Sequence, residues 1–379
     1  MVTAADVVVI GGGMAGVSVA RELAATGSVI LVETAGAIGT QSTGRSAAAW
    51  IASYGPDPVR RLTLASRAFL GDPDVPVHGP LLDPREYVVL ALAGERHLVE
   101  RDHEQALALP GLAEHIELID GTDAERRYPV LRPGRVEAAL IDHSAEFVDV
   151  AGLLQGYAAG ARERGAQVVV GAGVLGLARH GDTWEVTLAD DRRLRAPAVV
   201  NAAGAWGDHV AALAGIDPVG LTPRRRSVFV GPAAPAVDVA AMPMLNSASQ
   251  TWYVKPESGQ LLCSPEDAGP HEPGDPRPDE LEIARAIDEI NDATLLGVRS
   301  VRTTWAGLRT FAPDGLPVVG EEPGHPGFCW LVGQGGYGIQ MAPALARLTA
   351  SLVTGSAVPA DLAAAGVDPD AFSPRRFRA

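Results

Sequence analysis

Hydrophobic and polar positions near the amino terminus form two short apolar runs separated by a helical pattern. The first run, residues 6–10, is β-branched, as expected for a strand that is buried on both faces. A helical pattern extends from Met14 to about Thr26, and the second apolar run covers residues 28–32. This order predicts a βαβ unit, in which the two strands lie side by side in a parallel sheet.

The turn between the first strand and the helix contains Gly11, Gly13 and Gly16 in the spacing G-x-G-x-x-G. Gly11 permits a tight turn, Gly13 lets the backbone approach a pyrophosphate, and Gly16 lets the helix pack on the strand. The unpaired N–H groups at the helix amino terminus would face the phosphates. Glu33 ends the second strand, where a carboxylate accepts hydrogen bonds from a ribose. The unit therefore predicts a dinucleotide site for FAD or NAD.

A second G-x-G-x-x-G occurs at Gly171, Gly173 and Gly176, which raises the alternative of another nucleotide site for NAD(P)H. Only about seven residues separate Gly176 from the next β pattern, at residues 184–188. That length does not hold the crossover helix that presents phosphate-binding N–H groups. We expect a hairpin over residues 184–194 instead. One dinucleotide site without a nicotinamide site favours a tightly held flavin.

The rest of the chain divides into helical and β patterns that predict two domains. Helices are expected at residues 59–70, 97–107, 124–130, 150–164, 209–214, 280–291 and 340–353. Strands are expected as a pair within residues 81–92, and at residues 167–170, 198–201, 227–230, 251–255, 260–264 and 328–332. We predict an α/β fold with a Rossmann-type FAD-binding domain (residues 1–54, 145–215 and 304–379) and an inserted α+β substrate-binding domain, built on an antiparallel sheet (residues 55–144 and 216–303).

Composition narrows the classes of partner. The 379 residues are 47% hydrophobic, which allows two domains with substantial cores, and the net charge of −15 argues against nucleic acid as a partner. Cys263 and Cys329 make neither a disulfide framework nor a metal cluster, and the histidines lack metal-ligand spacing, so no metal site is predicted. The start lacks a basic region and no apolar run is long enough to span a bilayer. We therefore expect a cytoplasmic protein that is not an integral membrane protein.

A second glycine-rich turn, at residues 333–338, joins a β run to a helix. The helix amino terminus there would face the N1–C2=O edge of a flavin, where negative charge builds when the ring accepts a hydride. An ordinary strand-to-helix turn is the alternative.

Two arginines are candidates for holding an anionic substrate. Arg226 enters a β pattern at the end of a run of three arginines, and Arg309 lies among apolar residues. A bidentate guanidinium–carboxylate pair fixes orientation as well as charge. Tyr253, on an alternating strand, could add a hydroxyl, and Lys255, on the same strand face, is a candidate oxygen-activating charge. The alternatives are salt bridges for the arginines, core packing for Tyr253 and a solvated surface position for Lys255.

The motifs of the chain together resemble the FAD-dependent amine oxidoreductases of the D-amino acid oxidase and glycine oxidase superfamily. They are the amino-terminal βαβ unit (residues 6–33), STGRSAA (residues 42–48), VVNAAGAW (199–206), WAGLR (305–309), DGLPVVG (314–320) and GQGGYGIQ (333–340). Within the superfamily the resemblance is closest to the bacterial D-arginine dehydrogenases, and it covers nearly the whole chain. It implies non-covalent FAD and an amine that loses hydride from Cα to flavin N5. The resulting imine is hydrolysed to a 2-oxo acid and ammonia.

The resemblance also implies roles for individual residues. The substrate carboxylate would be bound by Arg226, Tyr253 and Arg309, the amine end would be lined by Gly336 and Gln340, and Tyr54 would close over the site. The implied cofactor contacts are Gly11, Gly13, Met14, Ala15, Gly16, Glu33, Thr43, Gly44, Arg45, Ser46, Ala47, Val174, Ala203, Gly204, Trp206, Arg309, Gly333, Gly335, Gly336, Tyr337, Gly338 and Ile339.

Three departures from the family pattern concern the substrate. Tyr87 stands where the D-arginine enzymes have a glutamate for the guanidinium, Ala49 replaces a histidine and Ile51 replaces a threonine. Glu86 is one residue away from Tyr87, on the opposite face of a strand. All three replacements make the pocket more apolar, so we expect a neutral, hydrophobic or aromatic D-amino acid or a related amine as the substrate, with arginine and lysine as poor substrates.

Other functions on the same fold stay open. A secondary-amine oxidase acting on sarcosine- or proline-like donors, or a 2-hydroxy acid dehydrogenase, would use the same two arginines. A flavin-containing subunit without catalytic activity is an alternative of another class. The expected partners are a small amino acid or amine carboxylate and an electron acceptor, either O2 or a quinone.

Overall fold

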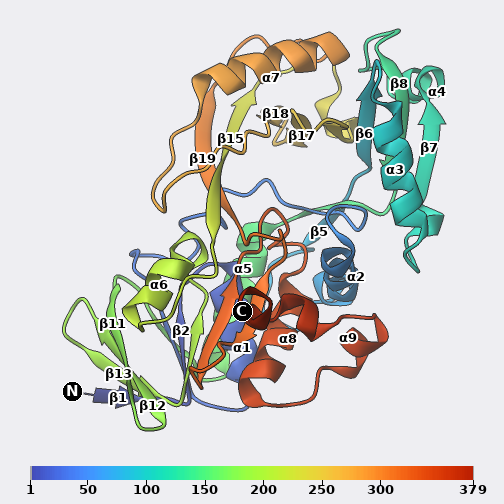
Figure 1. Cartoon of the computed structure of the whole chain (residues 1–379). Helices are drawn as coiled ribbons and strands as arrows, with labels where there is room; N and C mark the ends of the chain where they lie inside the picture. Colours follow the sequence, from blue (N-terminus) through green and yellow to red (C-terminus); the bar gives the residue numbers. More distant parts are fainter. Residues whose placement is uncertain (1, 379) are drawn as a thin grey trace.

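The structure, a computed structural model, describes residues 2–378, and a six-stranded sheet lies at the centre of its lower half (Figure 1). The strand order is β10 (Gln167–Val169), β3 (Val29–Val32), β2 (Val7–Ile10), β14 (Ala198–Asn201), β21 (Phe328–Val332) and β20 (Val318–Glu321). Neighbouring strands are parallel, except for the antiparallel pair β20 and β21. The strands β2 and β3 are buried at every position, which confirms the predicted βαβ unit.

Different elements cover the two faces of this sheet. One face packs on three helices, α1 (Met14–Leu23), α5 (Val150–Glu163) and α8 (Ala342–Thr354). The other face packs on a four-stranded sheet of β1 (Val2–Ala4), β13 (Arg193–Ala196), β12 (Thr183–Leu188) and β11 (Val174–His180), and on α6 (Gly207–Leu213). Alternate residues of β2 belong to the two cores, because Val7 and Val9 face the helices while Val8 and Ile10 face the second sheet.

The second G-x-G-x-x-G motif leads into a strand. Gly176 lies within β11, which pairs antiparallel with β12, and β12 pairs antiparallel with β13. No helix lies between Gly171 and β12 in this described part of the chain. The expected hairpin is therefore confirmed, and it begins one strand earlier than the hydrophobic pattern indicated.

An eight-stranded sheet forms the upper half of the molecule (Figure 1). Its order is β19 (Thr303–Phe311), β15 (Thr222–Gly231), β18 (Gln260–Ser264), β17 (Tyr253–Glu257), β16 (Met244–Ser247), β6 (Tyr87–Leu92), β8 (Val136–Asp142) and β7 (Ile116–Asp120). It contacts the helices α3 (Arg96–Leu107), α4 (Gly121–Arg127) and α7 (Glu280–Ala293).

This sheet is mixed, whereas the sequence pattern predicted an antiparallel one. The strands β16 and β6 pair in parallel, with Met244 opposite Tyr87, and join two antiparallel groups that come from distant parts of the chain. Alternation along a strand indicates which face is buried, but it carries no information on the direction of a neighbour that is distant in sequence.

The predicted strand pair within residues 81–92 is wrong. The strand β5 (Leu82–Pro84) does not pair with β6 but with β9 (Glu146–Val148), in a three-stranded sheet that also contains β4 (Ala49–Trp50). The bend at Arg85 and Glu86 sends the chain from this small sheet into the eight-stranded one. A charged bend resembles a hairpin turn in sequence, and only the tertiary partners distinguish the two.

The position of β19 differs from the prediction that the chain re-enters the FAD-binding domain at residue 304. All its residues pair with β15 in the eight-stranded sheet, from Thr303 opposite Val230 to Phe311 opposite Thr222. The division into an FAD-binding and a substrate-binding domain is our proposal, and β19 moves its last boundary from residue 304 to the end of the strand.

The remaining helices complete the lower half. The helices α2 (Asp57–Gly71) and α9 (Ala360–Ala364) contact each other, and α2 also packs on α8. Short 3₁₀ helices are η1 (Ala113–His115), η2 (Gly204–Trp206), η3 (Val239–Ala241), η4 (Pro369–Phe372) and η5 (Pro374–Phe377). Within residues 2–378, the helices are all too short or too polar to cross a membrane.

Candidate active site

A cavity of about 820 Å³ runs from the first glycine-rich turn to the eight-stranded sheet. At one end it is lined by the turn at Gly11 and by Glu33, and at the other by side chains of β6, β15, β17 and β19. The volume lies within the range of small-molecule and cofactor pockets, roughly 300–1,000 Å³. One continuous cavity therefore joins the predicted dinucleotide site to the predicted substrate site.

The first turn is built by close backbone approaches. Gly11 has φ +112°, and a Cβ atom there would overlap the carbonyl oxygen of Ala202 on the neighbouring β14 turn. A Cβ atom at Gly16 would overlap the carbonyl oxygen of Gly11, so α1 lies directly against the turn. Both glycines thus have the packing roles that the motif predicts.

Polar groups surround the amino terminus of α1. The N–H of Met14 donates to Thr43 Oγ1 at 3.0 Å, and the N–H of Gly12 donates to Glu33 Oε2 at 2.6 Å. The other carboxylate oxygen of Glu33 accepts from the N–H of Ala35 at 2.7 Å. Backbone N–H groups, the Glu33 carboxylate and a glycine turn without side chains therefore lie together at this end of the cavity. This combination fits the adenosine and pyrophosphate half of a dinucleotide.

Most of the predicted cofactor contacts line the cavity. They are Gly11, Gly13, Met14, Ala15, Glu33, Thr43, Arg45, Ser46, Ala47, Val174, Ala203, Gly204, Trp206, Arg309, Gly335, Gly336, Gly338 and Ile339. The other four, Gly16, Gly44, Gly333 and Tyr337, do not line it. Gly16 and Gly44 lie against backbone carbonyls, Gly333 has φ +74°, and the Tyr337 ring packs on Tyr54 with 5.0 Å between centroids. These four shape the turns around the cavity, which a motif alone does not distinguish from direct contact.

Every predicted substrate residue lines the other end of the cavity. They are Ala49, Tyr54, Tyr87, Arg226, Tyr253, Arg309, Gly336 and Gln340. They come from six separate segments of the chain, and the loop carrying Tyr54 meets the second glycine-rich turn at Gly336.

Arg309 faces the cavity without a carboxylate partner. Its Nη1 donates to the Tyr54 hydroxyl at 3.5 Å, and within residues 2–378 no Asp or Glu oxygen lies within 4.0 Å of its guanidinium. Burial alone would lower the pKa of Arg309, but the nearby Tyr54, Tyr253 and Glu266 outweigh it and raise the pKa. The guanidinium is therefore a permanent cation available to an anionic ligand.

Arg226 already has an internal partner, which the sequence pattern did not reveal. Its Nη1 donates to Glu266 Oε1 at 2.9 Å, and the two side chains are 14% and 5% exposed. Burial and the neighbouring Arg309 both lower the pKa of Arg226. Glu266 also lines the cavity, so the substrate end contains a carboxylate as well as the predicted apolar replacements.

Glu266 was missed because no motif marks it. It lies two residues after β18, in the segment Ser264–Pro265–Glu266–Asp267, which reads as an ordinary polar turn. Ser264 is the residue opposite Tyr253 in the sheet. Knowledge of this pairing would have indicated that an acid just beyond Ser264 lies near the tyrosine.

The tyrosines and the glutamine add neutral polar groups. Burial raises the pKa values of Tyr87 and Tyr253, so both hydroxyls stay protonated and can donate. The side-chain amide of Gln340 donates to Thr63 Oγ1 at 2.9 Å and to the carbonyl of Tyr54 at 3.4 Å. Gln340 thereby ties the Tyr54 loop to α2.

Glu86 lies outside the cavity. Its carboxylate accepts from the Tyr128 hydroxyl and from Arg127, both at 2.7 Å, and one of its oxygens lies 2.9 Å from His143 Nδ1. Tyr87 lines the cavity instead, as the change of face between adjacent residues requires.

Lys255 is not the solvated surface lysine that the sequence allowed. The side chain is buried rather than solvated, with its Nζ 3.1 Å from Glu257 and 4.5 Å from the centroid of the Phe147 ring. It does not line the cavity, and the ring of Phe147 on β9 lies against it. Across the described chain, no group of three or more His, Cys, Asp or Glu side chains could hold a metal ion.

Comparison with known proteins identifies a family. Residues 6–352 match the family described as DAO, FAD dependent oxidoreductase. The hydrogen cyanide synthase subunit HcnC of Pseudomonas aeruginosa is 24% identical over 71% of this chain, and the match spans 65% of that relative's length. Glycine oxidase of Bacillus licheniformis is 25% identical, over 93% of this chain and 94% of the relative.

A solved structure supports the same fold. L-α-glycerophosphate oxidase from Mycoplasma pneumoniae with FAD bound superposes with a TM-score of 0.83, covering 93% of this chain and 95% of that one. At 18% identity this likeness concerns the fold alone.

Proposed function

Because the chain belongs to the DAO family of FAD-dependent oxidoreductases, we propose that it oxidises a neutral D-amino acid to the 2-oxo acid and ammonia. The observation that carries this proposal is Arg309, a permanent cation that lines the cavity beside the Tyr54 hydroxyl and lacks an internal counter-ion among the described residues. A buried arginine without an internal counter-ion is suited to bind the carboxylate of a small substrate.

We infer the roles of the residues from the resemblance, and their positions in the cavity support these roles. Arg309 binds the α-carboxylate, and the protonated hydroxyl of Tyr253 donates a further hydrogen bond to it. The amine end lies toward Gly336 and Gln340, and the Tyr54 loop covers the bound substrate. When bound, FAD would supply the acceptor for the hydride that leaves Cα. The amine loses a proton in the same oxidation, and water then replaces the imine nitrogen to release ammonia.

The proposed preference for a neutral side chain rests on Ala49, Ile51 and Tyr87, which line the cavity without a charge. A cationic substrate side chain would have to leave water for a space without an available carboxylate. Compared with a site that offers such a partner, the loss is about 2–5 kcal/mol.

A panel of donors tests the proposal by bleaching of the bound flavin under anaerobic conditions. We expect D-phenylalanine, D-leucine and D-methionine to reduce the flavin with a higher kcat/KM than D-arginine or D-lysine, and the L-enantiomers to leave it oxidised. A higher kcat/KM for D-arginine than for all three neutral donors would contradict the proposed side-chain preference.

The same panel distinguishes the alternative functions. Sarcosine and proline represent secondary amines, and a 2-hydroxy acid represents an alcohol donor; Arg309 suits the carboxylate of each equally well. Bleaching by one of these alone would replace the proposed substrate class. If no donor bleached the flavin, a non-catalytic flavin-binding subunit would be favoured.

The electron acceptor is proposed to be O2 or a quinone. Turnover in an oxygen electrode, compared with turnover with an artificial quinone, separates an oxidase from a dehydrogenase. The buried position of Lys255 outside the cavity favours the dehydrogenase, because it removes the one lysine from contact with the flavin.

A further inference from the structure

Glu266 is a carboxylate inside the proposed substrate cavity that the proposed reaction does not use. Its side chain is 5% exposed, and Oε1 accepts a hydrogen bond from Arg226 Nη1 at 2.9 Å. The sheet register explains the neighbourhood of this pair. Arg226 lies opposite Gly307 on β19, and Arg309 lies two residues further along the same strand, on the same face. Two guanidinium groups and one carboxylate therefore share this end of the cavity.

The loop that carries Glu266 is anchored on both sides of the residue. Ser264 Oγ accepts from the N–H of Glu266 at 3.1 Å and donates to the carbonyl of Ser227 at 2.8 Å. Glu266 has φ +51°, a backbone conformation that non-glycine residues adopt only when the surroundings impose it.

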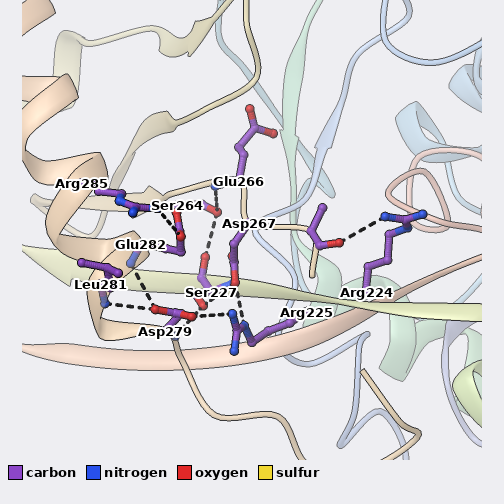
Figure 2. A network of polar contacts seen from close by, with 11 residues as sticks. Arg224, Arg225, Ser227, Ser264, Glu266, Asp267, Asp279, Leu281, Glu282 and Arg285 are labelled. Carbon is purple, nitrogen blue, oxygen red and sulfur yellow. Dashed lines mark hydrogen bonds and ion pairs between the residues drawn. The ribbon is translucent and has the colours of Figure 1, made fainter. Parts of the chain in front are cut away.

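The second anchor is Asp267. Its carboxylate accepts from the N–H of Ser227 at 2.6 Å, the hydroxyl of Ser227 at 2.9 Å and Arg225 Nε at 2.8 Å. Figure 2 shows this network beside β15, with the Glu266 side chain directed away from the side chain of Asp267. The backbone of Glu266 is thus held by the fold independently of the ion pair, and Arg226 is the group that binds its carboxylate.

The burial of both carboxylate oxygens of Glu266 argues against a role in binding a substrate cation. Oε1 is taken by Arg226, and Oε2 is buried without a hydrogen-bond partner. A lysine- or arginine-like side chain entering the cavity would not reach Oε2. The carboxylate acts on the substrate through its charge rather than through direct contact.

We propose that Glu266 is an internal counter-ion that sets the charge of the substrate end of the cavity, so that the enzyme accepts donors with one carboxylate and rejects donors with two. The inference rests on the proposed function in that it takes this end of the cavity as the carboxylate site. With Glu266 in place, the charged side chains there leave one positive charge in excess, which one α-carboxylate neutralises. A second carboxylate would be desolvated beside Glu266 without a free cation.

The inference is tested by equilibrium binding of unreactive acids to the FAD-loaded enzyme, measured by calorimetry. Valerate and glutarate have the same chain length and carry one and two carboxylates. We expect the wild type to bind valerate at least about tenfold more tightly than glutarate. In Glu266→Gln, which keeps a hydrogen-bond acceptor for Arg226, glutarate should tighten about tenfold or more relative to valerate.

Two further variants distinguish charge from structural damage. The double variant Arg226→Gln/Glu266→Gln removes a positive and a negative charge together, so the preference for valerate should return. Glu272→Gln removes a charge from an exposed position on the same loop and should leave the preference unchanged. If Glu266→Gln failed to fold, the double variant, which leaves neither partner of the Arg226–Glu266 pair buried alone, would be compared with the wild type, and loss of the preference for valerate there would overturn the inference.

Three results would overturn the inference: equal affinities of the wild type for the two acids, an unchanged glutarate-to-valerate ratio in Glu266→Gln, or a double variant that prefers glutarate. Failure to bind either acid would also overturn it. The proposed function fails separately, if no D-amino acid reduces the flavin while the acids still bind with the expected preference.

Discussion

At the scale of single residues, the position of the Arg309 guanidinium depends on contacts with neutral groups. A Cβ atom at Gly336 would lie 3.1 Å from Arg309 Nη1, 3.3 Å from its Cζ and 3.4 Å from the Tyr54 hydroxyl. Gly336 therefore gives the guanidinium the space in which it meets the tyrosine. The second glycine-rich turn therefore makes room for Arg309, in addition to presenting the amino terminus of a helix.

Gly336→Ala should displace the guanidinium by a few tenths of an ångström and weaken its alignment with a carboxylate. We expect kcat/KM for the best donor to fall about 10- to 100-fold, with little change in Tm, because misplacement costs rate before it costs folding. Steady-state kinetics and thermal unfolding measure the two effects. Gly36→Ala is the matched control, since a Cβ atom there meets nothing within 4 Å. An unchanged kcat/KM in Gly336→Ala would contradict this role.

At the scale of secondary-structure elements, the contact of α1 with the first turn determines whether the cofactor end can form. The helix begins at Met14, directly after the turn, and belongs to the same core as β2, α5 and α8. Gly16, in its first turn, leaves no space for a side chain between the helix and Gly11. Any movement of α1 away from the turn would also move the N–H groups that the phosphates require.

Gly16→Ala should therefore separate α1 from the turn and lower FAD retention. Overpacking of this kind costs roughly 1–3 kcal/mol of stability, and we expect the purified variant to contain less than about a tenth of the wild-type FAD. The ratio of flavin to protein absorbance gives the result. The control is Gly176→Ala, the third glycine of the other G-x-G-x-x-G motif, where the nearest atom to an added Cβ is Thr187 Cβ at 3.9 Å. Equal FAD content in the two variants would contradict the argument.

At the scale of the whole molecule, the cavity lies between two sheets, and peripheral ion pairs hold separate segments of the chain together. Asp361 binds Arg347 of α8, and Asp314 binds Arg376 near the carboxyl terminus. The hydrogen bond from Arg347 lowers the pKa of Asp361. Burial alone would raise the pKa of Asp314, but the hydrogen bonds from Arg376 and from the N–H of Leu316, together with the charge of Arg376, outweigh it and lower the pKa.

Stability should therefore fall in acid. A carboxyl group whose pKa is lower in the folded state contributes stability above its ordinary pKa of 3.8, and this is lost as pH falls through the folded value. The raised pKa of Glu146, caused mainly by burial, acts in the opposite direction but concerns one group.

We expect the urea concentration at the midpoint of unfolding to change little between about pH 7 and pH 5 and to decrease below about pH 4. Asp361→Asn should show a smaller decrease, because it removes one of the titrating groups. A midpoint that rose below pH 4 would contradict the assignment.

Local patterns were sufficient for the cofactor end of the molecule. The strand β2, the glycine turn and Glu33 lie within 28 consecutive residues, so the spacing along the chain already defines their arrangement. The absence of a crossover helix after Gly176 was equally predictable, because it depends only on the number of residues available. The individual candidates Arg226, Tyr253 and Arg309 came from the resemblance and from the β or apolar patterns beside which they lie.

Only the tertiary structure decided how these candidates are used. The parallel pairing of β6 with β16 brings Tyr87 to the same sheet face as Tyr253, and the pairing of β15 with β18 brings Glu266 to Arg226. Such pairings join segments that are distant in sequence, and the alternation of apolar residues does not identify the partner. By itself, the sequence determined that this chain has a dinucleotide-binding βαβ unit and two arginines that are candidates for binding an anionic substrate. The fold decided that both arginines line the cavity and that only Arg226 has an internal carboxylate partner among the described residues, because ion pairing depends on distances across the sheet and not on spacing along the chain.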